Sequence, residues 1–288
     1  MTQSAPEKST TVWQPPTSPR ALRAAVAVLD RVAPSLVARG ALRLWCTPTH
    51  ARRHDDIPGG TSWRLPGGIV GQTWGTGPRV YLVHGWGGYR AQLRTLVQPL
   101  VDAGHQVVAY DAPSHGDSGP GELGRRRSTL TELMTAVDTV VASHGPAHAI
   151  VGHSMGAAAA ALAVLDGTAS DRLVLITPLA DPEAYTVPFA RALGFRESTR
   201  LLFVRRMEAL VDRRLADLVL PDRAAGRLDL PPVLVLADRA DKEADPADGA
   251  RIADAWPMAE LLTSDGLGHR RILRDDATIA AIVDYVSA

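Results

Sequence analysis

The chain has 288 residues, of which 45% are hydrophobic and 22% are charged, enough for one large or two smaller globular domains. Its 31 basic and 31 acidic residues give a formal net charge of zero, which argues against a general nucleic-acid-binding protein, since such proteins present a basic surface. The single cysteine, Cys46, excludes an intrachain disulfide and a zinc site built from several cysteines. These facts favour a soluble globular protein of a reducing compartment.

The N-terminal region is polar at first and then more apolar. Residues 1–20 are proline-rich and lack the basic start and apolar run of a secretory signal, so we expect a disordered tail on a cytoplasmic protein. Residues 21–60 are predicted to be an N-terminal helical extension, because apolar residues recur at helical spacing from Leu22 to Val32. Charged residues interrupt Ala21–Trp45, so this stretch cannot span a membrane. A helix packed on the protein surface is one interpretation, and a basic amphipathic helix in contact with a membrane is the other.

From residue 61 onward, short apolar runs alternate with longer helical patterns. Two runs flank Pro66-Gly67-Gly68 and predict a β-hairpin. Six further predicted strands are Val80–Val83, Val107–Tyr110, Ala149–Val151, Leu173–Ile176, Val233–Leu236 and Leu261–Thr263. The helical patterns are Gln92–Ala103, Thr129–Ser143, Met155–Leu165, Asp248–Trp256 and Ala277–Val286. The alternation predicts an α/β fold with a doubly wound, mostly parallel sheet.

Residues 181–230 interrupt this alternation. They contain helical patterns around Phe189–Leu193, Arg200–Leu210 and Asp212–Val219, but no convincing strand. A connection of about 50 residues between two strands is far longer than usual. We therefore expect a helical lid inserted into one core, which residues 61–180 and 231–288 form together.

The strongest chemical pattern is Gly152-His153-Ser154-Met155-Gly156, which follows a predicted strand and opens an alanine-rich helix. This is the G-x-S-x-G pattern of a nucleophile elbow. A turn of this kind strains the serine backbone, and only small neighbours such as Gly152 and Gly156 avoid clashes there. The hydroxyl of Ser154 would lie above the carboxyl end of the strand, at the positive end of the helix.

A serine hydroxyl is a weak nucleophile unless a neighbouring base removes its proton. Of the nine histidines only His269 follows the last predicted strand, in a glycine-rich loop that can bring its imidazole over the sheet edge. The imidazole in turn needs a carboxylate that fixes its tautomer. Among the acids after the strand Val233–Leu236 we choose Asp241, with Asp238 second. Asp181, after the preceding strand, is a third candidate.

The segment His84-Gly85-Trp86-Gly87-Gly88 follows the first strand after the hairpin. Backbone N–H groups in such a loop can face an oxyanion, and glycines such as Gly85 allow a substrate to approach closely. We expect the amides of Trp86 and Met155 to be the two donors. We expect His84 to hold the loop through hydrogen bonds, and the side chain of His153 to point away from that of the neighbouring serine.

The order Ser154, Asp241, His269, with the glycine loop upstream, resembles the α/β-hydrolase superfamily from about Val80 to the C-terminus. The resemblance implies the α/β-hydrolase fold and a catalytic triad of these three residues. It also implies that residues 181–230 cover the site and shape an acyl pocket, whereas residues 1–60 lie outside the family pattern.

A second motif supports the resemblance. Residues 111–118, Asp-Ala-Pro-Ser-His-Gly-Asp-Ser, look like the family's D-x-P-G-H-G-x-S loop. Ser114 replaces the usual glycine there, a departure that would tighten or redirect the turn. Asp238 likewise replaces the glycine that often precedes the family's acid, so the assignment of Asp241 stays open to the alternatives above.

We expect a serine hydrolase that cleaves an ester-type acyl bond of a small molecule through an acyl-enzyme, as carboxylesterases and lipases do. The same triad serves thioesterases, amidases or peptidases, and C–C bond hydrolases, which remain alternatives. A catalytically inactive binding protein with the hydrolase fold is the alternative outside the enzymes.

Other ligands and partners are not indicated. No glycine-rich loop has the Lys-Ser/Thr ending of a P-loop, no G-x-G-x-x-G opens a helix, and no H-E-x-x-H is present. We therefore expect no cofactor and no metal, no nucleic-acid partner and no stable membrane insertion. Monomer and homodimer remain equally open.

Overall fold

The fold is built on one eight-stranded sheet. The computed structural model of the protein describes residues 18–48 and 56–288. The strand order is β1-β2-β4-β3-β5-β6-β7-β8. Strand β2 (Val70–Trp74) runs antiparallel to both of its neighbours, β1 (Thr61–Arg64) and β4 (Gln106–Asp111), and the other strands pair in parallel. The structure confirms the doubly wound, mostly parallel sheet.

The predicted hairpin is present as β1 and β2, and each of the six further predicted strands is present and longer than its apolar run. The remaining strands are β3 (Arg79–Val83), β5 (Ala147–His153), β6 (Ser170–Ile176), β7 (Val233–Asp238) and β8 (Ala259–Ser264). The observed strands are longer because small and polar residues at their ends also pair with the neighbouring strands. In β5, for example, Gly152 and His153 pair with Leu175 and Ile176 of β6.

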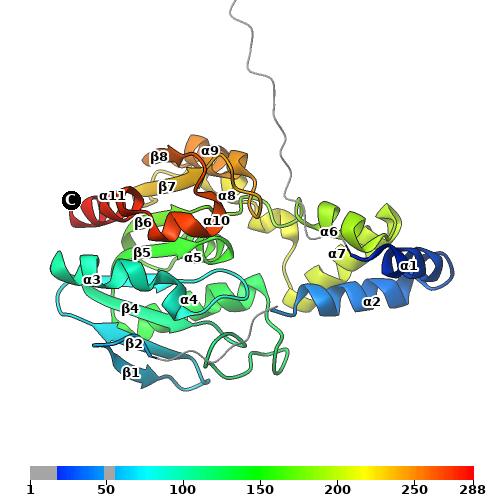
Figure 1. Ribbon diagram of the computed structural model, residues 1–288, viewed down its shortest axis with the longest axis horizontal. Coiled ribbons are helices and arrows are strands. Elements are labelled where there is room, and N and C mark those ends of the chain that lie inside the picture. The colour runs from blue at the N-terminus through cyan, green and yellow to red at the C-terminus, as the bar shows by residue number, and fades with distance from the viewer. Residues whose placement is uncertain (1–17, 49–55) are drawn as a thin grey trace, which may run out of the picture.

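Alternate side chains of the strands point to opposite faces of the sheet, and helices cover both faces (Figure 1). On one face lie α3 (Arg94–Asp102) and α11 (Asp276–Ser287), which pack on residues such as Leu82 and Val151. On the other lie α4 (Leu130–His144), α5 (Met155–Leu165) and α9 (Pro246–Ala255). Short helical turns complete the core at η1 (Arg90–Leu93), α10 (Gly268–Arg271) and η3 (Ile272–Arg274).

Residues 181–230 and the N-terminal extension supply a separate group of helices. The former contain α6 (Thr186–Leu193), α7 (Glu197–Val211), η2 (Leu215–Leu218) and α8 (Leu220–Ala224). Where the sequence predicts a helical pattern over Asp212–Val219, the structure has only the 3₁₀ turn η2. Asp212 takes a left-handed conformation, which ends α7 before it.

The N-terminal extension is helical in its first part. It contains two helices, α1 (Arg20–Val32) and α2 (Pro34–Trp45). The break falls at Ala33, whose backbone (φ −143°, ψ 59°) is not helical, because a residue before proline avoids the helical region. Of the predicted disordered tail, residues 1–17 lie outside the described residues, and Arg20 already opens α1.

Helices α1, α2, α6 and α7 pack together at one end of the molecule, and we call them the four-helix unit (Figure 1). Its interior holds an edge-on aromatic group in which the Trp45 ring lies 4.9 Å from Phe189 and 5.7 Å from Phe203. The N-terminal extension therefore packs mainly on the helices of residues 181–230.

A buried carboxylate fixes α1 to α7. Asp30 accepts hydrogen bonds from the Arg196 backbone N–H (3.1 Å), the Arg196 Nε (2.8 Å) and the Thr199 hydroxyl. Burial alone would raise the pKa of Asp30, but the hydrogen bonds from Thr199 and Arg196 outweigh it and hold the pKa below its ordinary value. Asp30 thereby caps the first turn of α7.

We predict that Asp30→Asn lowers the free energy of unfolding by about 2 kcal/mol, because a neutral amide loses the charge-assisted bonds and is poorly matched to the three donors around it. Urea denaturation at neutral pH measures this loss. The control is Asp171→Asn, whose side chain is 76% exposed, and it should change stability by less than about 0.5 kcal/mol. Equal effects of the two substitutions would contradict the role given to Asp30.

The contribution of Asp30 to the stability of the fold should depend on pH. Because folding lowers the pKa of Asp30, its charge stabilises the fold above the ordinary value of 3.8, and this stabilisation is lost as the pH falls through the folded-state pKa. The stability difference between the wild type and Asp30→Asn should therefore shrink in acid.

Candidate active site

Ser154 lies at the sharp turn between β5 and α5. Its backbone has φ 58° and ψ −126°, in the left-handed half of conformational space that non-glycine residues rarely occupy. Glycines on both sides make the turn possible. A Cβ at Gly152 would lie 2.6 Å from the Cα of Ala157, and one at Gly156 would lie 2.2 Å from the carbonyl oxygen of His84.

His269 and Asp241 meet in a buried pair. The Nδ1 atom of His269 is 2.7 Å from Oδ2 of Asp241. The other carboxylate oxygen of Asp241 accepts the backbone N–H groups of Glu243 (2.7 Å) and Ala244 (3.0 Å). Because the carboxylate can only accept, Nδ1 carries the hydrogen, and Nε2 is left as the basic nitrogen.

The two alternative acids bond elsewhere. The carboxylate of Asp238 accepts hydrogen bonds from the Ser264 hydroxyl and from the backbone N–H groups of Ala240, Leu267 and Gly268. Burial alone would raise the pKa of Asp238, but these bonds lower it. Asp181 accepts the N–H groups of Glu183 and Ala184 in its own turn. Asp238 thus supports the loop that carries His269, and Asp241 contacts its imidazole.

The side chain of His153 connects the elbow to the histidine loop, a contact that could not be predicted from the spacing of residues along the chain. Its Nε2 is 2.8 Å from the carbonyl oxygen of His269, and the two rings lie 4.7 Å apart. Burial, with His269 next in effect, lowers the pKa of His153 to about 3. His153 therefore stays neutral and donates a hydrogen bond that ties the backbone of His269 to the residue preceding Ser154.

The loop after β3 lies directly against the elbow. The Gly88 N–H donates to the Gly85 carbonyl oxygen (2.9 Å), which makes a tight turn with Gly87 at φ 66°. A Cβ at Gly85 would lie only 3.0 Å from the Cβ of Ser154. Trp86 lies within this turn. On the other side of the serine, Met155 opens α5, and its N–H belongs to the first helical turn, which has no acceptor within the helix.

His84 ties this loop to the one after β4. Its Nε2 accepts the Ala112 N–H (2.9 Å), so Nδ1 carries the hydrogen and donates to the Gly85 carbonyl oxygen (2.8 Å). Burial lowers the pKa of His84 to about 4. With both ring nitrogens engaged, His84 holds the loop.

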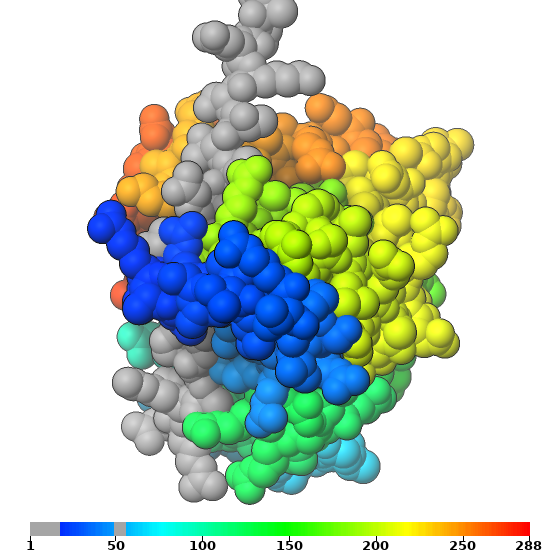
Figure 2. Space-filling model, turned by 90° about the vertical axis from the view of Figure 1, so that its right-hand side faces the viewer, coloured from blue at the N-terminus to red at the C-terminus, as the bar shows by residue number. Residues whose placement is uncertain are grey.

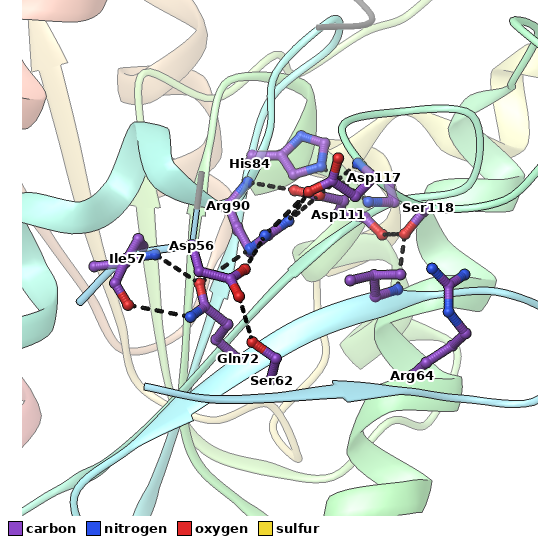
Figure 3. A network of polar contacts seen from close by, with 12 residues as sticks. Asp56, Ile57, Ser62, Arg64, Gln72, His84, Arg90, Asp111, Asp117 and Ser118 are labelled. Atoms are coloured by element: carbon purple, nitrogen blue, oxygen red, sulfur yellow. Dashed lines mark hydrogen bonds and ion pairs between the residues drawn. The ribbon is translucent and has the colours of Figure 1, made fainter. Parts of the chain in front are cut away.

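A buried arginine that the sequence did not single out supports the same loop (Figure 3). Asp111 accepts both the Arg90 backbone N–H (2.6 Å) and its guanidinium. The guanidinium also reaches Asp117 (3.1 Å) and Asp56 (2.6 Å), and its Nε reaches Gln72 (3.2 Å). Burial would lower the pKa of Arg90, but the carboxylates raise it above its ordinary value, so the arginine stays charged.

The departure at Ser114 has a structural explanation. Ser114 has φ 63°, the left-handed conformation for which the family uses glycine. Its hydroxyl accepts the Gly121 N–H (3.3 Å) and donates to the Gly124 carbonyl oxygen (3.2 Å). These two bonds join the turn to the following loop.

The comparisons with known proteins agree with this geometry. The family model described as "Alpha/beta hydrolase family" matches residues 80–282. No curated protein matches the chain.

Within the part of the chain that the structure describes, no helix is both long and apolar enough to cross a membrane, and no three His, Cys, Asp or Glu side chains are grouped so as to hold a metal ion.

Solved structures with different activities share the fold. A monoacylglycerol lipase from Paleococcus ferrophilus is 22% identical, with a TM-score of 0.59 over 76% of this chain and 98% of that one. An esterase from Exiguobacterium antarcticum is 16% identical, with a TM-score of 0.57 over 76% and 96%. A putative non-heme bromoperoxidase from Mycobacterium tuberculosis is 18% identical, with a TM-score of 0.60 over 82% and 100%.

At these identities the likeness shows the fold alone. The family match covers both the elbow and the histidine loop, together with the sheet that carries them. The chain belongs to the alpha/beta hydrolase family.

Proposed function

We propose that the protein is a serine hydrolase that cleaves an ester-type acyl bond of a small molecule. The observation that carries the proposal is the 2.7 Å hydrogen bond between His269 Nδ1 and Asp241 Oδ2, made in a loop that His153 holds beside the strained elbow at Ser154. In this proposal the nucleophile, the acid and the base follow β5, β7 and β8, whose carboxyl ends lie at the same edge of the sheet.

In the proposed reaction, Ser154 Oγ attacks the acyl carbon while its proton passes to His269 Nε2. Asp241 stabilises the imidazolium that forms. The backbone N–H groups of Trp86 and Met155 bind the oxyanion. Collapse of the tetrahedral intermediate breaks the bond to the leaving group, which takes the proton from His269. Water then attacks the acyl-enzyme with His269 as base, releasing the acid and restoring the serine.

We also propose that residues 181–230 act as a lid. They leave the sheet after β6 and return at β7. Strand β6 lies next to β5, which leads into the elbow. Their first turn is held by Asp248 of α9, which accepts the Ala180 N–H (3.0 Å) and the Tyr185 hydroxyl (2.8 Å). A long helical connection that is fixed at its base in this way can cover the site and shape an acyl pocket.

We predict that Ser154→Ala abolishes covalent labelling by a fluorophosphonate probe, because the probe phosphonylates an activated serine hydroxyl. Gel fluorescence after labelling measures this. The matched control is Ser198→Ala, an exposed serine on α7 that should label as the wild type does. Labelling that persists in Ser154→Ala would overturn the nucleophile assignment.

We predict that Asp241→Asn lowers kcat by roughly a thousandfold or more, because an amide at this position favours the wrong imidazole tautomer. Asp238→Asn should reduce turnover far less, since Asp238 bonds the loop backbone and leaves the imidazole to Asp241. Steady-state hydrolysis of a p-nitrophenyl ester by the two variants decides this, and the reverse order would assign the acid to Asp238.

The bond that is cleaved can be tested with a substrate panel. We predict faster turnover of p-nitrophenyl esters of short acyl chains than of acyl-CoA thioesters or aminoacyl amides, as expected for an esterase. Preferred cleavage of thioesters or amides would move the enzyme to one of those classes. Absence of any turnover and of probe labelling would indicate a binding protein with the hydrolase fold.

A further inference from the structure

The outward side of helices α1 and α2 is unusually apolar, and we call it the outer face of α1 and α2. The structure has twelve large apolar side chains that are exposed among the described residues, and half of them lie on these two helices. They are Leu22, Val28, Leu29, Val32, Leu36 and Leu44, and their exposed fractions run from 42% to 77%. Figure 2 looks at this end of the molecule and shows the two helices (blue) lying across it.

Helical spacing explains why these side chains share a face. On α1, Leu22, Leu29 and Val32 are separated by seven and three residues, which places them on one stripe. Val26, which packs on the four-helix unit, lies four residues after Leu22 and three before Leu29, and the buried Asp30 lies beyond it. The fold therefore covers one edge of a broad apolar side of α1 and leaves the rest of that side exposed.

The exposed charges of α1 and α2 themselves have a single sign. Residues 18–48 contain five arginines, Arg20, Arg23, Arg31, Arg39 and Arg43, all of them exposed. The only acidic residue of this segment, Asp30, is buried and paired with Arg196. On α2 exposed leucines and arginines lie together, since Leu36, Arg39, Arg43 and Leu44 recur at helical spacing and all face solvent.

This combination distinguishes between the possible partners. A second copy of the chain would bring two sets of arginines together without acidic residues to neutralise them. A nucleic acid would leave the exposed leucines and valines without a contact. An anionic bilayer surface matches both features, because apolar side chains enter the headgroup boundary while arginines reach the phosphates.

We propose that the outer face of α1 and α2 docks the protein on an anionic lipid surface. The contact is peripheral, with helices that lie in the interface. Each arginine near such a surface strengthens binding about fivefold, and apolar burial adds to this. Lipid docking does not depend on the proposed nucleophile Ser154. The docking proposal and the proposal of ester hydrolysis can therefore fail independently of each other.

The test is co-sedimentation of the full chain with vesicles. We expect binding to vesicles of phosphatidylcholine and phosphatidylglycerol in a ratio of roughly two to one, much weaker binding to pure phosphatidylcholine, and release as salt is raised. Ser154→Ala should bind as the wild type does. Equal or absent binding to the two kinds of vesicle would overturn the proposal.

Two pairs of substitutions separate the apolar and the basic contributions. Leu29→Gln with Val32→Gln, and Arg39→Gln with Arg43→Gln, should each weaken binding on the order of tenfold. The matched controls lie outside α1 and α2: Met258→Gln with Leu262→Gln for exposed apolar residues, and Arg125→Gln with Arg127→Gln for exposed charge. The controls should bind vesicles normally.

Folding and self-association are read in parallel. The four double variants should keep the thermal unfolding and the soluble-ester hydrolysis of the wild type, because their replaced side chains are exposed and lie outside the proposed triad. Light scattering gives the mass of the particle. Two results together would overturn the proposal: no binding to anionic vesicles, and a dimer that dissociates in the variant with Leu29→Gln and Val32→Gln. They would assign the outer face of α1 and α2 to a second copy of the chain.

Discussion

The close approach of helix α5 to the loop after β3 is the constraint on which the candidate site depends. At Gly156 there is no room for a side chain, because its Cβ would lie 2.2 Å from the His84 carbonyl oxygen, and at Gly152 it would meet the backbone of Ala157. These two glycines allow α5 to begin directly at the sheet edge, with Ser154 held at φ 58°. The same packing brings the turn that contains Trp86 against the turn that contains Met155.

Neutral histidines and one charged arginine then fix the loops around this turn. Burial keeps the pKa values of His84, His115 and His153 at about 4, 3 and 3, so these three side chains make hydrogen bonds and ring contacts without carrying charge. The imidazole of His269 instead bonds to a carboxylate, with Nδ1 2.7 Å from Oδ2 of Asp241. On the other side, Arg90 joins the loop after β3 to the loop after β4 through Asp111. Chemically similar side chains thus serve different purposes according to their partners.

Much of this could be predicted from sequence, since buried parallel strands are continuous apolar runs and the elbow needs glycines at fixed positions. Spacing alone could not separate Asp241 from Asp238, because both follow β7 and only the path of the loop decides which carboxylate reaches the imidazole. The packing of α1 and α2 on α6 and α7 was also out of reach, because it depends on contacts such as Asp30 with Arg196 that are 166 residues apart. Arg90 was missed since nothing local marks an arginine whose partners come from distant segments.

The most direct test of the proposed mechanism is a crystal structure of the protein after reaction with an organophosphate ester such as diethyl p-nitrophenyl phosphate, whose tetrahedral adduct resembles the acyl-transfer intermediate. We predict a phosphorus atom bonded to Ser154 Oγ, with one phosphoryl oxygen within hydrogen-bonding distance of the Trp86 and Met155 amides. An adduct on another residue, or a phosphoryl oxygen directed away from both amides, would contradict it.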